Sequence, residues 1–331
     1  MIARYSSRTV ALLLFASATL GAACGTGSSS PDEQQSLAPG DHTFSLQHDG
    51  RTRSYIVHVP SGINGPVPVL LAFHGGGGSA AGFKSSADLD RVADAEGFLV
   101  VYPNGTGVLA NTLLTFNSGD GCCGYALDNN VDDVGFAVAL LEDLERRTPI
   151  DRRRIYATGH SNGAGMSHRL AAERSDLIAA IAPVAGSLDL AAFAPSMPVP
   201  VLQIHSVDDP RALYEGGLGP PFPGTTRQHF HQPAQAGLDR WIAANGCPTV
   251  PDTVETRIGA AGTMNEGQTA TLLRWAPCTS GAEVSHWKLT GAGHGWPGNL
   301  TPSTPESIIG PYTSIVIAAE EVWAFVSRFS R

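Results

Sequence analysis

The residue that most clearly suggests chemistry is Ser161, which lies in the pentapeptide GHSNG at residues 159–163. A Gly-x-Ser-x-Gly pattern is short enough to occur by chance, so its context decides what it means. Here the stretch 153–159, which favours a strand, precedes the serine, and a stretch with helical spacing, 162–174, follows it. A serine on such a strand-to-helix turn is presented in a strained, accessible conformation. The context therefore predicts that Ser161 is a catalytic nucleophile.

A serine nucleophile needs a base that accepts its proton and an acid that orients the base. In this architecture the three residues follow one another along the chain in the order serine, acid, histidine. Asp208 and Asp209 directly follow the apolar stretch 198–207 and are the candidate acids. His294 lies among glycines late in the chain, in LTGAGHGWPG, and is the candidate base. Because an imidazole base must be neutral, we expect activity to fall as the pH drops through roughly 6 to 7.

The other histidines have simpler interpretations. His205 lies inside an apolar stretch and is expected to be a hydrogen-bonded core residue, whereas His229 and His231 lie in a loop and are expected to be solvated or to face substrate. His160 precedes the nucleophile and points elsewhere. Asp132 and Asp133 begin a helical stretch, which favours a capping role for both.

The negative oxygen of a tetrahedral intermediate requires backbone N–H donors. One donor is expected from Asn162, directly after the nucleophile, and one from the glycine-rich segment HGGGGSAAG at residues 74–82. Gly76 is the predicted second donor and Gly75 the alternative. Glycines at this position let the backbone approach the reacting carbonyl.

The elements around these residues alternate between strands and helices. Residues 42–48 and 51–60 favour an antiparallel pair of strands, whereas 67–73 and 97–103 are continuous apolar runs typical of strands covered on both faces. The intervening segment 85–97 has helical spacing. This unit recurs along the chain, which predicts an α/β fold with a mostly parallel central sheet and helices on both faces. Long loops are expected at 103–131 and 211–233.

The N-terminus indicates export. Residues 1–23 combine early arginines with a short apolar run, as in a signal peptide, and 24–40 is typical of a flexible tether. LGAAC at residues 20–24 resembles a lipobox, which predicts lipidation of Cys24 and anchoring to a membrane; ordinary cleavage before an unmodified Cys24 is the alternative. Residues 41–331 then form the catalytic domain. The expected location is extracellular or on the cell surface of a bacterium.

The net charge and the cysteines indicate which partners and which cysteine chemistry to expect. The net charge is −9 and no basic cluster is present, which disfavours nucleic acid as a partner. In an exported protein the four cysteines after Cys24 favour disulfides. Cys122 and Cys123 are adjacent, so we favour pairing of Cys247 with Cys278 and leave a vicinal ring or two thiols at 122 and 123. Zinc is the alternative, but the spacing of a zinc site is lacking, and no metal or other cofactor is expected.

Several segments, in order, resemble one family of exported α/β-hydrolases, the polyhydroxybutyrate depolymerases and feruloyl esterases. They are LLAFHGGGGSA, FNSGDGCCG, VDDVGF, IDRRRIYATGHSNGAGMSHRLA, APVAG, ANGC and GAGHGWPG, and the resemblance covers residues from about 50 to 330. The resemblance implies the α/β-hydrolase fold, with Ser161 as nucleophile and His294 as base. HSVDDP corresponds to the family's H-G-T-x-D-P, which makes Asp209 the acid, although Ser206 and Val207 depart from that pattern.

The resemblance also implies a Cys247–Cys278 disulfide and an aromatic substrate contact at Phe116. Trp296, two residues after His294, is the other predicted substrate-binding residue. The predicted function is a secreted serine carboxylesterase acting on feruloyl or acetyl esters of plant polysaccharide. The chain ends directly after its last predicted helix, which favours soluble fragments as substrates. The alternatives are a polyhydroxybutyrate or polyester depolymerase and, in another class, a surface lipoprotein that binds without catalysis.

Overall fold

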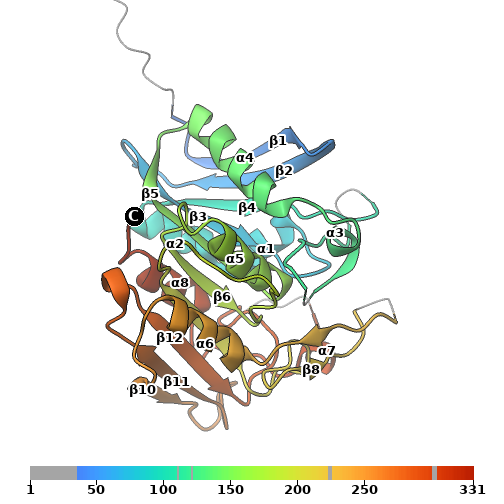
Figure 1. Ribbon diagram of the computed structural model, residues 1–331, viewed down its shortest axis with the longest axis vertical. Coiled ribbons are helices and arrows are strands. Elements are labelled where there is room, and N and C mark those ends of the chain that lie inside the picture. Colours follow the sequence, from blue (N-terminus) through green and yellow to red (C-terminus); the bar gives the residue numbers. More distant parts are fainter. Residues whose placement is uncertain (1–35, 110–111, 121, 223–225, 300–303) are drawn as a thin grey trace, which may run out of the picture. The chain divides into compact units, whose positions relative to one another are not determined.

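The central element of the fold is a ten-stranded sheet in the order β1-β2-β4-β3-β5-β6-β7-β12-β11-β10 (Figure 1). A computed structural model describes residues 36–109, 112–120, 122–222, 226–299 and 304–331, which belong to one compact unit. The predicted signal peptide, Cys24 and most of the predicted tether lie outside the described residues. The strands are β1 Gly40–His48, β2 Arg51–Val59, β3 Val67–Phe73, β4 Leu99–Pro103, β5 Ile150–His160, β6 Ala180–Val184, β7 Val201–Ser206, β10 Asp252–Ile258, β11 Thr269–Trp275 and β12 Val284–Thr290.

The middle of this sheet is parallel and its two edges are antiparallel. Neighbouring strands from β4 through β3, β5, β6 and β7 to β12 all pair in parallel. β1 and β2 form an antiparallel hairpin at one edge, and β10 and β11 extend the other edge. Every residue of β3, β4, β6 and β7 is buried, as expected for apolar strands covered on both faces. The predicted fold class is therefore confirmed.

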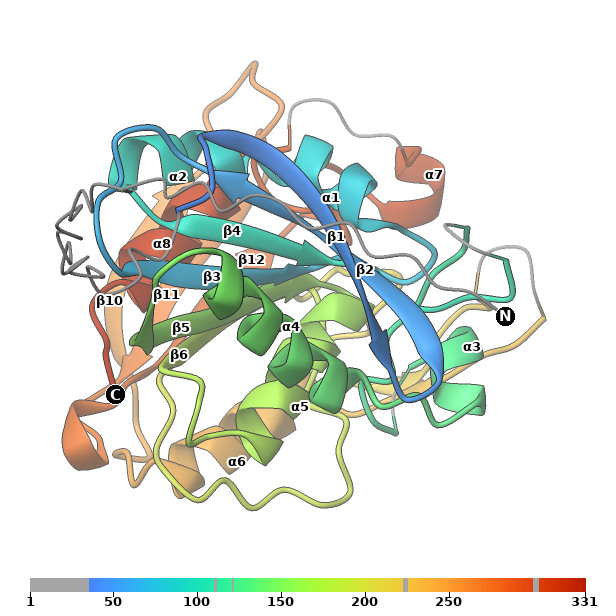
Figure 2. The ribbon, with the colours of Figure 1, turned by 90° about the horizontal axis from the view of Figure 1, so that it is seen from above.

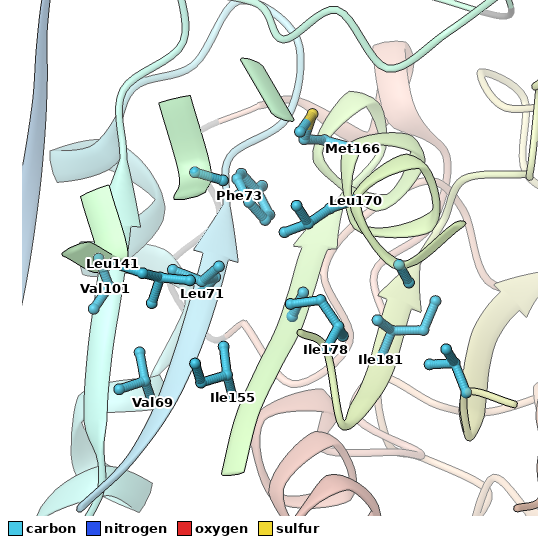
Figure 3. Close-up of a cluster of buried hydrophobic side chains, with 14 of the residues drawn as sticks. Val69, Leu71, Phe73, Val101, Leu141, Ile155, Met166, Leu170, Ile178 and Ile181 are labelled. Carbon is cyan, nitrogen blue, oxygen red and sulfur yellow. The ribbon is translucent and has the colours of Figure 1, made fainter. Parts of the chain in front are cut away.

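Helices cover both faces of the sheet. One face packs against α4, α5 and α6, and the other against α1, α2 and α8 (Figure 2). Successive side chains of a strand point to opposite faces, so β3 supplies Val69, Leu71 and Phe73 to the first core (Figure 3) and Leu70 and Ala72 to the second. The helices are α1 Ala80–Ala87, α2 Leu89–Glu96, α3 Gly124–Asp128, α4 Asp133–Arg147, α5 Asn162–Glu173, α6 Ala234–Ala244, α7 Glu306–Ile309 and α8 Ala318–Val326.

Two local features differ from the sequence prediction. The expected single helix at 85–97 is two helices, because Asp88 adopts a left-handed conformation with φ 57° between α1 and α2. Aspartate is one of the few residues that tolerate this conformation. The strands β10 and β11 were not predicted, since nearly all residues of β10 are exposed and most of β11 is only partly buried, so neither has a clear apolar face to reveal it.

Two disulfides are present among the described residues. Cys247, which follows α6, is bonded to Cys278, which follows β11, and this is the pairing favoured from the sequence. Cys122 and Cys123 form a vicinal disulfide, one of the two states left open. In the part of the chain that the structure describes, every helix is too short or too polar to span a bilayer.

Candidate active site

Ser161 lies on the sharp turn between β5 and α5. Its backbone is strained, with φ 56° and ψ −115°, and its N–H donates to the carbonyl of Val184 over 2.9 Å. The glycines of the pentapeptide are required by space. A Cβ on Gly163 would lie 2.1 Å from the carbonyl oxygen of Phe73, and one on Gly159 would lie 2.4 Å from that of Gly163. The sequence pattern thus reflects steric limits of this turn.

The hydroxyl of Ser161, the imidazole of His294 and the carboxylate of Asp209 form a chain of hydrogen bonds. Ser161 Oγ lies 2.9 Å from His294 Nε2, and His294 Nδ1 lies 2.7 Å from Asp209 Oδ2. The three residues follow β5, β12 and β7. These strands run parallel in the sheet, so their carboxyl ends lie at the same edge, which brings the three residues together.

The carboxylate of Asp209 is fixed by several donors. Its Oδ1 accepts hydrogen bonds from the backbone N–H groups of Arg211 at 2.7 Å and Ala212 at 2.9 Å. Burial alone would raise the pKa of Asp209, but His294 and His205 beside it hold that pKa far below its ordinary value. Asp209 is therefore ionised at neutral pH and suited to hold the Nδ1–H of His294.

Asp208, the alternative acid, has a different neighbour. Its Oδ2 accepts a hydrogen bond of 2.7 Å from the backbone N–H of Gly291. Ser206, where the family pattern has glycine, donates its hydroxyl to the carbonyl of Ala292 over 2.6 Å. Both contacts hold the loop that carries His294. His294 therefore contacts Asp209, whereas Asp208 stabilises the loop that carries His294.

A cavity of about 470 Å³ opens beside Ser161 and His294. Gly75–Gly78, from the segment predicted to bind the oxyanion, form part of its wall. The two cysteines of the vicinal disulfide, Cys122 and Cys123, also line it. A Cβ on Gly76 would lie 2.9 Å from the ring of Phe222 and 3.3 Å from Cys123 Sγ, so this wall is closely packed. Asn162 is the first residue of α5, where backbone N–H groups lack partners within the helix.

Three polar residues that position the cavity walls were not predicted in this role. His74 Nδ1 donates to the carbonyl of Gly75, and its Nε2 accepts from the N–H of Gly105; burial lowers its pKa to about 4, so the ring is neutral. The side chain of Asn162 exchanges two hydrogen bonds with the backbone of Phe116, at 2.7 and 2.9 Å. These bonds fix the start of the glycine run and the segment 116–118.

Asp133 is the third. It lies beside the predicted helix cap but is buried, with its Oδ1 2.6 Å from Arg53 and its Oδ2 accepting from the N–H of Asn117. Asp132 alone caps α4, by accepting from the N–H of Gly135. The capping interpretation was therefore right for Asp132 and wrong for Asp133. The buried ion pair could not be predicted from the sequence, because Arg53 lies far from Asp133 along the chain and local spacing does not relate the two residues.

The two aromatic residues predicted to contact substrate require correction. Phe116 is fully buried, with its ring against Phe73 and His74, because the hydrogen bonds to Asn162 turn its side chain into the core. Trp296 is also buried, and its Nε1 donates to the carbonyl of Ala87. Neither lines the cavity. The apolar side chains that do include Leu113 and Phe222, which come from the two long loops, and Ile308, which comes from α7.

The remaining histidines lie around this cavity or beneath it. His160 borders the cavity and its Nε2 donates to the backbone carbonyl of His294 over 2.6 Å, which supports the loop of the candidate base. His205 is fully buried and contacts Asp209 at 3.3 Å, as expected for a core histidine. His229 and His231 line the cavity and so face the space that a substrate would occupy.

The one cluster with metal-ligand spacing among the described residues is Asp41, His58 and Asp90. Lys84 already neutralises it, since its Nζ lies 2.8 Å from Asp41 and also pairs with Asp90. An ammonium group therefore takes the place that a cation would need. The cluster lies away from Ser161 in the sequence and its residues do not line the cavity.

Comparisons with known proteins identify relatives of this chain. The family model described as Esterase PHB depolymerase matches residues 53–229, just over half of the chain. A bifunctional acetylxylan esterase/xylanase of Neocallimastix patriciarum is 26% identical over 86% of this chain and 34% of its own length. Feruloyl esterase B of Piromyces equi is 29% identical over 73% of this chain and 42% of its own length. The chain thus spans well under half the length of these two relatives.

In two further comparisons the match covers a larger share of the other protein. The putative esterase NocK of Nocardia uniformis subsp. tsuyamanensis is 30% identical over 79% of this chain and 75% of its own length. Among solved structures, a thermostable esterase superposes with a TM-score of 0.53 over 88% of this chain and 63% of the other, at 15% identity. At that identity the likeness supports the fold alone.

Proposed function

Because the chain belongs to the Esterase PHB depolymerase family, we propose that it is a serine carboxylesterase that hydrolyses feruloyl or acetyl esters of plant polysaccharide. The observation that carries the proposal is the hydrogen-bonded chain from Ser161 through His294 to Asp209 at the wall of a cavity. A hydroxyl, a neutral imidazole and a buried carboxylate in this order are the requirements of nucleophilic acyl transfer.

In the proposed reaction Ser161 Oγ attacks the ester carbonyl while His294 Nε2 accepts its proton. Asp209 keeps the Nδ1–H of His294 oriented and stabilises the imidazolium that forms. The backbone N–H groups of Asn162 and Gly76 donate to the oxyanion. The intermediate collapses to an acyl-enzyme as His294 returns the proton to the departing alcohol. Water, activated by His294, then releases the acid and restores Ser161.

The substrate class is supported by the relatives, whose names include acetylxylan esterase and feruloyl esterase. A polyester such as polyhydroxybutyrate is the second candidate. It is favoured by the family's description and by the exposed apolar side chains at the cavity, Leu113 at 59% and Ile308 at 44% exposure. Both candidates use the same acyl-enzyme chemistry and differ in the group that the cavity holds.

A substrate panel tests this proposal. The purified protein is assayed with methyl ferulate, acetylated xylo-oligosaccharides and hydroxybutyrate oligomers, with Ser161→Ala as the matched control. We expect hydrolysis of the first two, and a loss of about 10⁶-fold in the Ala variant. Faster hydrolysis of the hydroxybutyrate oligomers would instead identify the protein as a polyester depolymerase. Absence of hydrolysis of every ester would support a lipoprotein that binds without catalysis.

We also propose that the protein is exported and anchored through lipidated Cys24. The support is the N-terminal pattern and the presence of disulfides, which persist in oxidising compartments. Fractionation of cells that express the full chain checks this proposal: the wild type should sediment with membranes and Cys24→Ser should not. If the wild type and Cys24→Ser were both found in the soluble fraction, the protein would be secreted without a lipid anchor.

A further inference from the structure

A second cavity, of about 440 Å³, lies behind the wall of the candidate active site. The two cavities share the segment around β9 Phe230–His231, which pairs with β8 Gly217–Leu218. His229 and His231 line the catalytic cavity, whereas Phe230 and Gln232 line the second one. This is the alternation of an extended strand, whose successive side chains point to opposite faces. A single strand of backbone therefore separates the two cavities.

The polar wall of the second cavity is held by hydrogen bonds. Asp189 is 9% exposed, and its Oδ1 accepts from the N–H of Gln232 over 2.9 Å, while its Oδ2 lies 3.9 Å from His231 Nδ1. Asp120 Oδ2 accepts from the N–H of Ala191, and the N–H of Asp120 donates to the carbonyl of Asp189. These bonds fix two carboxylates at the cavity before any ligand arrives.

The remaining lining adds donors and an aromatic ring. Arg240 borders the cavity, with Nη1 donating to the carbonyl of Leu190, and Gln232 contributes a side-chain amide. Phe230 is 60% exposed, which is unusual for an aromatic residue that serves only the core. Apolar surface from Leu188, Leu190 and Ala236 completes the wall.

This lining selects the chemistry of a ligand. Two carboxylates disfavour an anion, and the guanidinium of Arg240 offsets part of their attraction for a cation. Carboxylates, an amide and a guanidinium together accept and donate hydrogen bonds to several hydroxyl groups. An exposed aromatic ring offers an apolar face for C–H groups. An uncharged, hydroxyl-rich ring with one apolar face, which is a sugar residue, meets these conditions.

We propose that the second cavity binds a sugar residue of the polysaccharide chain whose ester is cleaved at Ser161. The inference rests on the proposed function, because it assigns the cavity to a neighbouring part of the same substrate. Phe230 supplies the stacking face, and Gln232, Asp120, Asp189 and Arg240 bind hydroxyl groups. The cavity is thus a specificity site for chains over small esters.

Kinetics of Phe230 variants test this assignment. Phe230→Ala should raise KM for acetylated xylo-oligosaccharides about threefold to tenfold, without changing kcat or the KM for methyl ferulate. Phe230→Tyr, which keeps the ring, should behave as the wild type. Ile258→Ala, which removes an exposed apolar side chain of β10, is the matched control and should have no effect. An unchanged KM for the oligosaccharide in Phe230→Ala, or an equal change for both substrates, overturns the proposal.

A binding measurement separates this inference from the esterase proposal. Unesterified xylo-oligosaccharide is titrated into Ser161→Ala and into the Ser161→Ala/Phe230→Ala double variant, with binding followed by NMR or calorimetry. Saturable binding to the first and about threefold to tenfold weaker binding to the second is expected. This readout holds even if no ester is hydrolysed. Absence of binding to Ser161→Ala, or equal binding to both variants, rejects the sugar site.

Discussion

Asp208 and Asp209 are adjacent in sequence, but their carboxylates have different neighbours. Asp209 contacts His294 at 2.7 Å, whereas Asp208 accepts from the N–H of Gly291. The family pattern selected Asp209, and the departures at Ser206 and Val207 left Asp208 as an alternative. The structure adds the physical distinction: only one of these side chains is oriented toward the imidazole that contacts Ser161.

Exchanging each acid for its amide tests this difference. Asp209→Asn should reduce kcat by about 10³-fold to 10⁴-fold, because an amide no longer stabilises the required tautomer and the imidazolium. Asp208→Asn is the matched control and should keep activity close to that of the wild type, since an amide oxygen still accepts from Gly291. Steady-state kinetics on methyl ferulate measure both. Equal losses in the two variants would contradict the assignment of Asp209.

Asp189 allows a prediction for stability. Burial raises its pKa from the ordinary 3.8 to about 6. At a pH between 3.8 and about 6, Asp189 holds a proton in the native state that it releases in the unfolded state. The free energy of unfolding therefore decreases as the pH rises through this range. The loss should total about 2 kcal/mol between pH 4 and 6, and Asp189→Asn should lack it.

Chemical unfolding of the wild type and Asp189→Asn across that pH range makes the measurement, and other titrating groups largely cancel in the difference. The asparagine can still accept the hydrogen bond from Gln232. A stability difference between the two proteins that does not change with pH would show that Asp189 is not protonated in the native state at pH 4 to 6.

The meeting of residues that follow a fixed order along the chain could be predicted, whereas contacts that depend on tertiary neighbours could not. Ser161, His294 and Asp209 follow from the pentapeptide, the chain order and the resemblance. The supporting contacts of His74, Asn162 and Asp133 join distant segments that no local spacing relates. Phe116 and Trp296 were wrongly expected in the cavity, because an aromatic residue near a motif reveals nothing about the direction of its ring.

At the scale of elements, continuous apolar runs identified the buried strands well, since burial on both faces leaves a clear pattern. β10 and β11 were missed because β10 is an exposed edge strand and β11, its neighbour, is only partly buried. The long loops were recognised as loops, but α3 and the β8–β9 pair within them were not predicted. Neither was α7, since the residues of all these short elements have no periodicity to detect.

The Cys247–Cys278 bond joins α6 to the antiparallel edge of the sheet and closes a loop with a sequence separation of 31. Replacing both cysteines with serine should lower the free energy of unfolding by about 3 to 4 kcal/mol, chiefly because the unfolded chain gains freedom. The hydrogen bonds among Ser161, His294 and Asp209 do not involve this bond, so kcat should persist under conditions where the variant is folded. Denaturant midpoints and kinetics check both statements. Lost activity in a folded variant would mean that this edge controls the site.

For the whole molecule, the parallel sheet determines where the candidate active site lies. Strands β5, β7 and β12 end at one edge, and each continues into one of the three residues that meet there. The helices on both faces bury the strands and leave that edge to the loops. Described residues of the two long loops, among them Leu113, Phe222 and His231, contribute to the walls of the cavity. Loop conformation has no sequence periodicity, which explains why the fold was predictable while the shape of the cavity was not.

The most direct test of the central claim is labelling with a fluorophosphonate probe, followed by peptide mapping. The probe reacts with a serine only when a neighbouring base activates it. We expect one adduct, on Ser161, formed at a rate that falls at least about a thousandfold in His294→Ala. An intact, folded protein that acquires no adduct, or one that is labelled at another serine at an undiminished rate in that variant, would contradict the account.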